Sequence, residues 1–253
     1  MKVIQPNCRT RFTASDIDFI VSVFASEAGS SNCLVKLFSD PDSLDAILDH
    51  ELLFRALLEY NSCLQVSPHF YFYVLVRHVL RRSGIEDRMV ADYVAEMLAE
   101  FASTERLRRP LPNDDRPLDY LFEMLAALHK ADDSTQFLIR AHVGNHSLFV
   151  SGIFPDYIRF RAQFRGAPQM EYYENMGSAN FRVAGDHRLA QRYELAPIFD
   201  TLSHHFHDVR LALNDMTDRL ISLGDRNYSL EALLSQNGAN PTDSEHESGA
   251  ATG

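Results

Sequence analysis

The stretch SPHFYFYVLVRHVLRRSG, residues 67–84, decides the fold of this chain. Its aromatic and β-branched side chains would also suit a β-strand. However, Ser67 followed by Pro68 is a typical helix start, because the fixed φ and missing N–H of proline fit the first helical turn. The arginines at the other end and Gly84 indicate a helix C-terminus. We therefore predict a helix that is apolar on nearly all sides and lies in the centre of the protein.

Helical spacing of apolar residues also dominates the rest of the chain, and no stretch shows the clear alternation of a strand. We expect helices that begin near Thr13, Ser31 and Asp40, with the third continuing to Leu58. Further helices are expected over residues 86–101, 118–130, 134–153, 155–165 and 168–183. The prediction is an all-α, bundle-like single domain of about eight to ten helices over residues 1–224. A polar, proline-rich connection, residues 104–117, is the best internal boundary. Residues 225–253 are small, polar and acidic, which predicts a disordered tail.

The last long segment has the most regular pattern, with apolar residues alternately three and four apart. This repeat is typical of one continuous helix that packs lengthwise on other helices of the chain or on a partner copy. Pro197 is expected either to start that helix or to kink it away from the one before. A protein partner or self-association through a helical surface follows as one hypothesis. The repeat consists of Phe199, Leu202, Phe206, Val209, Leu213, Met216, Leu220 and Leu223.

Composition narrows the class of protein. The net charge of −11 and the pI of about 5.4 disfavour binding to nucleic acid or to anionic membranes. Cys8, Cys33 and Cys63 form no C-x-x-C pair, which favours reduced thiols. The first residues do not resemble a signal peptide, and the longest apolar run, residues 70–76, is too short to cross a bilayer. We expect a cytoplasmic protein.

Two histidines, His142 and His146, stand one helical turn apart in HVGNHSLFVSGIF, residues 142–154. Both fall in the middle of a broad apolar face, so we expect them to point into the core. One interpretation is a pair of core imidazoles that are hydrogen-bonded to tyrosines. The other is a metal or haem site, with His78 and His187 as further ligands, because this spacing lets two imidazoles share a metal.

The carboxylates that could complete such a site are all expected on the polar sides or flanks of their helices. They are Asp18, Asp45, Asp49, Asp92, Glu96, Asp119, Glu123 and Glu174. A second histidine group, residues 200–208, is expected to face water because it lies opposite the apolar repeat. Arg159, Arg161 and Arg165 either form a basic patch or are simply solvated.

No phosphate-binding loop, nucleophile elbow or catalytic cysteine setting is recognisable, so no catalytic residue is assigned and the chain is expected to be non-enzymatic. Arg77 lies among apolar residues and needs a carboxylate partner or an anionic ligand, and we favour a structural ion pair. Arg77, His78, Tyr172 and Tyr173 are the candidate ligand-binding residues. No cofactor can be named.

Part of the chain resembles an uncharacterised bacterial protein family with the motifs Gly-Asp-x-x-Leu-Phe, Gly-x-Phe-Pro and Tyr-Tyr-x-x-x-Gly. Asn145 replaces the aspartate, and Asn180-Phe181 replaces an Ala-Tyr pair. The resemblance implies a bacterial source and a helical domain. It does not indicate any activity, cofactor or partner, because none is known for that family. The matching residues are Gly144, Leu148, Phe149, Gly152, Phe154, Pro155, Tyr172, Tyr173 and Gly177.

Three functions are therefore open. The first is a non-enzymatic interaction or regulatory protein that uses a helical surface. The second is a helical protein that binds a metal, haem or small molecule through His142 and His146. The third is an enzyme of unrecognised type with a pocket lined by tyrosine and histidine, where Arg77, His142 and Tyr173 would meet.

Overall fold

The structure is a computed structural model that describes residues 3–28, 40–59, 66–101 and 121–224. In these ranges all regular secondary structure is helical, which confirms the all-α prediction. The predicted helix after Ser31, the boundary over residues 104–117, Cys33, Cys63, Asp119 and the tail over residues 225–253 lie outside the described residues. The elements are η1 (Cys8–Arg11), α1 (Ala14–Ala28), α3 (Pro41–Leu48), α4 (Glu51–Glu59), α5 (Pro68–Arg82), α6 (Arg88–Phe101), α8 (Leu121–Leu128), α9 (Asp133–Ile153), α10 (Pro155–Arg165), α11 (Met170–Gly185), α12 (Arg188–Arg192), α13 (Ala196–His204) and α14 (Phe206–Gly224).

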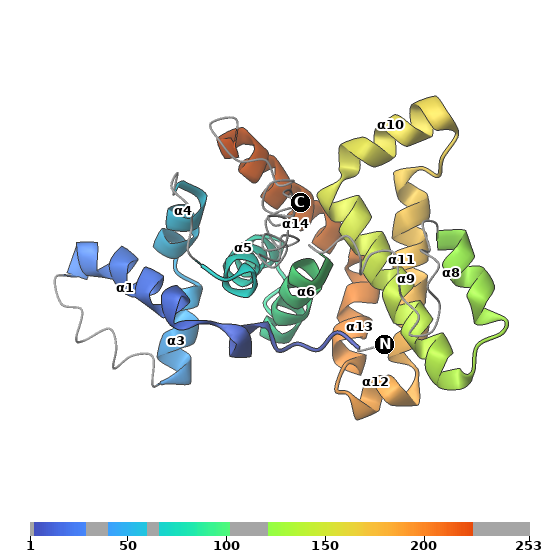
Figure 1. Cartoon of the computed structure of the whole chain (residues 1–253), viewed down its shortest axis with the longest axis horizontal. Coiled ribbons are helices and arrows are strands. Elements are labelled where there is room, and N and C mark those ends of the chain that lie inside the picture. The colour runs from blue at the N-terminus through green and yellow to red at the C-terminus, as the bar shows by residue number, and fades with distance from the viewer. Residues whose placement is uncertain (1–2, 29–39, 60–65, 102–120, 225–253) are drawn as a thin grey trace, which may run out of the picture.

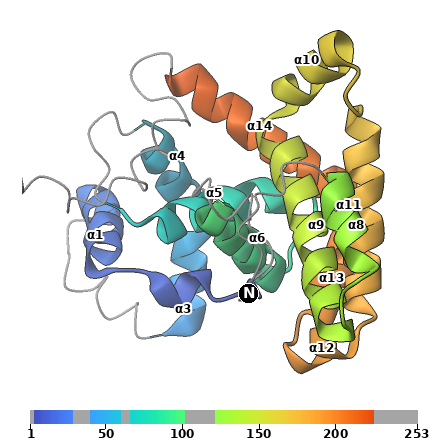
Figure 2. The ribbon, with the colours of Figure 1, turned by 45° about the vertical axis from the view of Figure 1, so that its right-hand side comes forward.

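The helices form two groups that meet in the middle of the molecule (Figure 1). In the first group, α5 packs along α6, with η1, α3, α4 and α1 beside them. In the second, α9 packs along α11, α11 packs along α13, and α8 lies against α9 (Figure 2). Helix α14 contacts both α5 and α9, so it joins the two groups. No helix in the described ranges is both long enough and apolar enough to span a bilayer.

Helix α5 is the buried central helix that the sequence predicts. The Ser67 side chain accepts a hydrogen bond from the backbone N–H of Phe70, and Pro68 occupies the first turn. The helix ends at Ser83, and Gly84 follows with φ of +80°, a conformation that glycine adopts without strain. The residues from Phe70 to Arg77 are all buried, which confirms the prediction of a helix covered on every side.

Two helices that the sequence predicts as continuous are each broken, and this raises the number of helices above the expected range. The segment after Asp40 divides into α3 and α4 at Asp49 and His50. There, the His50 ring accepts a hydrogen bond from the backbone N–H of Leu52 and caps the new helix. The segment after Pro197 divides into α13 and α14 at His205, whose φ of −109° and ψ of 23° are not helical. The apolar repeat continues across that break because one non-helical residue changes the direction of the chain without changing its buried side.

The apolar repeat of α13 and α14 lies in the core of the single chain. Phe199, Leu202, Val209 and Leu213 are fully buried, while Phe206 and Met216 are exposed by only 3% and 1%. Helix α13 packs on α11, and α14 packs on α9 and α5. This repeat therefore serves contacts within the chain, and a partner surface has to be found elsewhere.

Glycines let the helices of the second group approach closely. A Cβ atom on Gly144 would lie 2.8 Å from the ring of Phe181, and one on Gly177 would lie 2.1 Å from the ring of Phe206. A Cβ on Gly152 would lie 2.8 Å from the Leu213 side chain. These three glycines also carry the motif resemblance, so in this chain the matching positions are places where an aromatic or aliphatic side chain presses against a helix backbone.

Candidate interaction surface

His142 and His146 lie on α9 and point inward, as predicted, with exposed fractions of 4% and 9%. The His142 ring contacts the ring of Phe101 at 5.5 Å between centroids. The two imidazole centroids are 6.3 Å apart and tilted by 41°. Apolar burial of this kind disfavours the charged form of imidazole, and it lowers the pKa of His146 to about 4.

The histidine pair acquires no further metal ligands in the described part of the chain, where no group of three or more potential ligands gathers. The Nδ1 atom of His146 has no hydrogen-bond partner among the described residues. The interpretation of the two histidines as hydrogen-bonded core residues stays a prediction. The metal hypothesis for the pair stays a prediction.

His78 and His187, which the sequence offers as additional ligands, take part in separate local structures. The His78 ring stacks on Phe54 at 3.7 Å, and its Nε2 lies 3.2 Å from a Glu51 oxygen. Burial lowers the pKa of His78. His187 caps α12 by accepting a hydrogen bond from the backbone N–H of Leu189. Both imidazoles thus have structural roles at helix ends or helix contacts.

Arg77 forms the structural ion pair that the sequence favours. Its Nε and Nη2 atoms donate to the two carboxylate oxygens of Asp49 at 2.9 and 3.1 Å, and its Nη1 donates to the backbone carbonyl of Glu86 at 2.7 Å. Arg88 donates to the same carboxylate at 3.2 and 2.7 Å. Burial opposes the ionised carboxylate, but these two arginines hold the pKa of Asp49 below its ordinary value.

The prediction that Asp92 and Glu96 face solvent is wrong. Their exposed fractions are 2% and 1%, because the N-terminal segment lies over this side of α6. Asp92 accepts hydrogen bonds from the backbone N–H and the side chain of Arg9, and Arg11 lies 3.2 Å from a Glu96 oxygen. Burial raises the pKa of Asp92, against the opposing effect of Arg9. A local helical pattern cannot reveal a distant segment that supplies matching charges.

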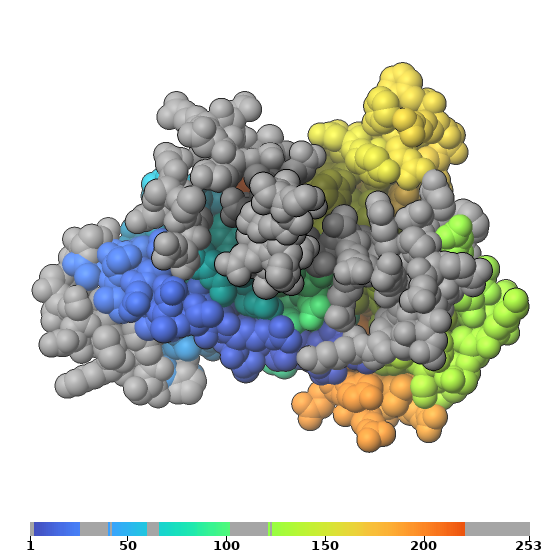
Figure 3. Space-filling model, in the orientation of Figure 1, coloured from blue at the N-terminus to red at the C-terminus, as the bar shows by residue number. Residues whose placement is uncertain are grey.

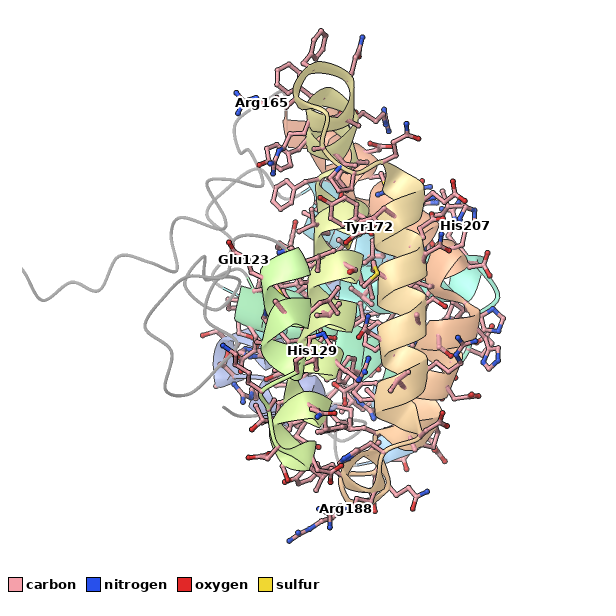
Figure 4. The ribbon with its side chains drawn as sticks, turned by 90° about the vertical axis from the view of Figure 1, so that its right-hand side faces the viewer. Glu123, His129, Arg165, Tyr172, Arg188 and His207 are labelled. Carbon is pink, nitrogen blue, oxygen red and sulfur yellow. The ribbon has the colours of Figure 1, made fainter. Side chains whose placement is uncertain are left out.

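The second histidine group is exposed, as predicted. Asp200, His204, His207 and Asp208 all lie on the surface of α13 and α14. His204 contacts Asp200 at 3.3 Å, and His207, labelled at the edge of the molecule in Figure 4, contacts Glu174 of α11 at 3.0 Å. Each imidazole pairs with a single carboxylate, which is the behaviour of a solvated charged face.

Tyr172 and Tyr173 lie at the start of α11 with their rings 5.9 Å apart in an edge-to-face arrangement. Tyr173 packs against the apolar cluster between α8 and α9, and burial raises its pKa, opposed by the nearby Arg161. Tyr172 is 37% exposed. The described contacts do not bring Arg77, His142 and Tyr173 together into the pocket that the enzyme hypothesis needs.

The most unusual surface in the described ranges belongs to α10. Tyr157, Phe160 and Phe164 are exposed by 53%, 51% and 65%. They are three and four residues apart, so they share one side of the helix, and Pro155 and Ile158 anchor the other side in the core. We call Tyr157, Phe160 and Phe164 the aromatic face.

Helix α10 projects from the body of the protein (Figures 1 and 3). The chain turns at Phe154, Pro155 starts the helix in the new direction, and its main contacts are with α9 and α11. It ends at Gly166, whose φ of +61° is the left-handed conformation of a helix C-cap. The aromatic face therefore stands on a well-bounded helix with few neighbours.

Arginines border the aromatic face. The guanidinium of Arg161 lies 5.4 Å from the centre of the Tyr157 ring and donates to its hydroxyl at 3.2 Å. Arg165 lies close to the tip of the molecule and has no ion-pair partner among the described residues (Figure 4). Arg159 pairs with Asp156 at 2.9 Å. The helix is thus locally basic on an otherwise acidic chain.

The sequence reasoning identified Tyr172 and the three arginines but missed the exposed phenylalanines. The signal was present, because Tyr157, Phe160 and Phe164 have helical spacing and Ile158 lies on the opposite side. A helix with apolar residues on two opposite sides can bury only one of them against its own chain.

No protein-family model, curated protein or solved structure matches this chain. The functional argument therefore rests on the geometry of the chain itself, and the resemblance to a bacterial family stays a prediction.

Proposed function

We propose that this chain is a non-enzymatic interaction protein that binds an acidic segment of a partner protein on the aromatic face of α10. The observation that carries the proposal is the grouping of exposed rings on one helix. Among the described residues, three of the eight large apolar side chains with high exposure lie on this one helix, and the other five belong to other parts of the chain. Contiguous exposed apolar surface on a soluble domain is typical of binding sites.

The composition of the face is that of an interaction surface. Tyrosine, phenylalanine and arginine are enriched in protein interfaces and in their energetically dominant positions, and lysine and glutamate are depleted there. Buried Pro155 and Ile158 anchor the opposite side of α10, so a partner would meet a helix whose position is already fixed. Such pre-organisation lowers the entropic cost of binding.

Charge complementarity defines the partner. Arg165 lacks an ion-pair partner in the described part of the chain, and Arg161 adds a second positive charge beside the rings. A segment that alternates acidic and apolar residues would satisfy both features. An anionic membrane would offer the same charge, but the net charge of −11 on the whole chain opposes adsorption to it.

The test selects random peptides displayed on phage against the purified chain and then against a Phe160→Ser, Phe164→Ser variant. We expect enrichment of peptides rich in aspartate, glutamate and aromatic residues on the original chain, and loss of their binding to the variant. Affinity should also fall with Arg165→Glu and with added salt, because ion pairs at the rim of an interface are screened.

Leu211→Ser is the matched control, since Leu211 is 46% exposed and lies on α14 rather than on α10. It should retain full peptide binding, and thermal melts should confirm that all variants fold. Selected peptides without acidic residues, or equal binding to both variants, would refute the proposal. Binding of the chain to anionic vesicles with the same dependence on Phe160 and Phe164 would also refute it.

A further inference from the structure

A cleft opens between α8 and α9, on a different part of the molecule from the aromatic face. Its volume is about 510 Å³, within the range typical of small-molecule sites. Two leucines, Leu125 and Leu128, supply an apolar wall. His129, Gln136 and Arg140 supply polar groups, and His129, labelled in Figure 4, directly follows the last residue of α8.

Arg140 is half-buried in this cleft and has no carboxylate partner among the described residues, although the chain has an excess of acidic residues. Its Nη1 donates to the amide oxygen of Asn180 at 3.2 Å, and the Asn180 amide nitrogen donates to the backbone carbonyl of Met176 at 2.9 Å. The neighbouring α11 therefore holds the guanidinium in place through a neutral group. Its Nε and Nη2 atoms have no hydrogen-bond acceptor among the described residues.

The two arginines that are more deeply buried than Arg140 both have carboxylate partners. Arg77 and Arg210 each lie against a carboxylate, from Asp49 and Glu174 respectively. Burial of a guanidinium without a counter-ion removes favourable solvation. An anionic ligand that binds to the guanidinium would compensate for this loss. Two parallel N–H donors of arginine match the two oxygens of a carboxylate.

We propose that the cleft between α8 and α9 binds a small molecule with an apolar body and a single carboxylate head, which Arg140 receives. The apolar body would lie against Leu125 and Leu128. Gln136, whose amide nitrogen donates to the Ala131 carbonyl, leaves its amide oxygen to accept a hydrogen bond from a polar substituent. This inference is independent of the proposed function, because α10 contributes nothing to the cleft.

Octanoate is a suitable probe, and 1-octanol and inorganic phosphate are its neutral and headgroup-only counterparts. In calorimetric titrations of the full chain, we expect octanoate to bind at least about tenfold more tightly than 1-octanol or phosphate, since a hydrogen-bonded charge contributes at least that much. Arg140→Gln should remove this preference and leave 1-octanol binding unchanged. Equal affinity for octanoate and 1-octanol would overturn the assignment of the anionic head.

Arg192→Gln is the matched control, because Arg192 is exposed on α12 and does not line the cleft. It should bind octanoate as the original chain does. A nuclear magnetic resonance titration supplies a second measurement without substitution, in which the Nε–H signal of one arginine should move with octanoate and disappear from the spectrum of Arg140→Gln. Octanoate binding that Arg140→Gln leaves intact would overturn the proposal.

Discussion

The two groups of helices reach a buried core by different physical means. Around α5 and α6, buried charges meet in pairs, and Asp49 alone receives hydrogen bonds from Arg77 and Arg88. Around α9 and α11, glycines face aromatic rings, and the buried His146 ring has no ion-pair partner among the described residues. The second group also contains an ion pair, between Arg210 and Glu174, but its closest helix contacts depend on shape. The two groups should therefore respond differently to substitution and to pH.

The largest expected effect comes from breaking the charged group. Asp49→Ala would leave Arg77, which is only 3% exposed, without its carboxylate. Removing one member of a buried ion pair typically costs about 3–5 kcal/mol, because the remaining charge is no longer compensated. Urea unfolding at neutral pH should therefore give a strongly lowered midpoint.

Asp18→Ala supplies the control, since Asp18 is exposed on α1. It should change the free energy of unfolding by less than about 0.5 kcal/mol. The double change Asp49→Ala with Arg77→Met should recover a substantial part of the loss, because it removes the isolated charge. A loss below about 1 kcal/mol for Asp49→Ala would contradict the role of charge in this group.

The second prediction tests shape in the other group. Gly177→Ala places a Cβ 2.1 and 2.3 Å from two ring atoms of Phe206 and 3.0 Å from the Ser147 Cβ. The helices must separate, and overpacking of this kind costs about 3 kcal/mol at the upper end of the usual range. Gly185→Ala should cost less, because its new Cβ would lie 3.3 Å from Phe199.

The double change Gly177→Ala with Phe206→Leu distinguishes a steric cause from a loss of helix flexibility. If the ring of Phe206 is the obstacle, thermal unfolding should show partial recovery relative to Gly177→Ala. Two losses that simply add would instead mean that Gly177 and Phe206 do not act on each other.

The sequence could predict features whose signals are local, but not contacts between residues that are far apart in the chain. Helix α5 was predictable because its signals are local, from the Ser67 cap to Gly84. The partners of Asp92 and Glu96 were not, because Arg9 and Arg11 are more than 80 residues away in sequence. The break at His205 was missed because the apolar repeat continues through it, and the repeat reports burial rather than helix continuity. Of the candidate ligand residues, Tyr172 is exposed on α11, whereas Arg77 has a structural partner.

The third prediction concerns pH and the second group. The folded-state pKa of His146 is about 4, below its ordinary value of 6.5, because burial opposes protonation. The unfolded chain therefore binds this proton first as the pH falls, and stability is lost from about pH 6.5 down to about pH 4. Between pH 7 and pH 5, His146 should account for about 2 kcal/mol of lost stability.

His146→Leu should remove that share of the slope in urea titrations at a series of pH values, and it also eliminates an unpaired ring nitrogen. His69 and His78, whose pKa values are also lowered by burial, should keep a smaller slope in the same direction. An unaltered slope in His146→Leu would place the pH sensitivity in the first group.

The smallest predicted effect tests whether the buried charges of the first group stabilise it together or pair by pair. The Ser67 hydroxyl caps α5 and donates to Asp16 at 2.8 Å, and Asp16 is fully buried with hydrogen bonds from the backbone N–H groups of Ser67 and Thr13. Ser67→Ala should cost about 1 kcal/mol in the free energy of unfolding, the usual value of an N-cap. Ser83→Ala, at the other end of the same helix, is the exposed control.

Because the backbone N–H groups still satisfy Asp16, the loss in Ser67→Ala should stay near the value of a single cap. A loss as large as that of Asp49→Ala would mean that Asp16 belongs to one extended network with the arginine pairs, and that charge stabilises the first group as a unit rather than pair by pair.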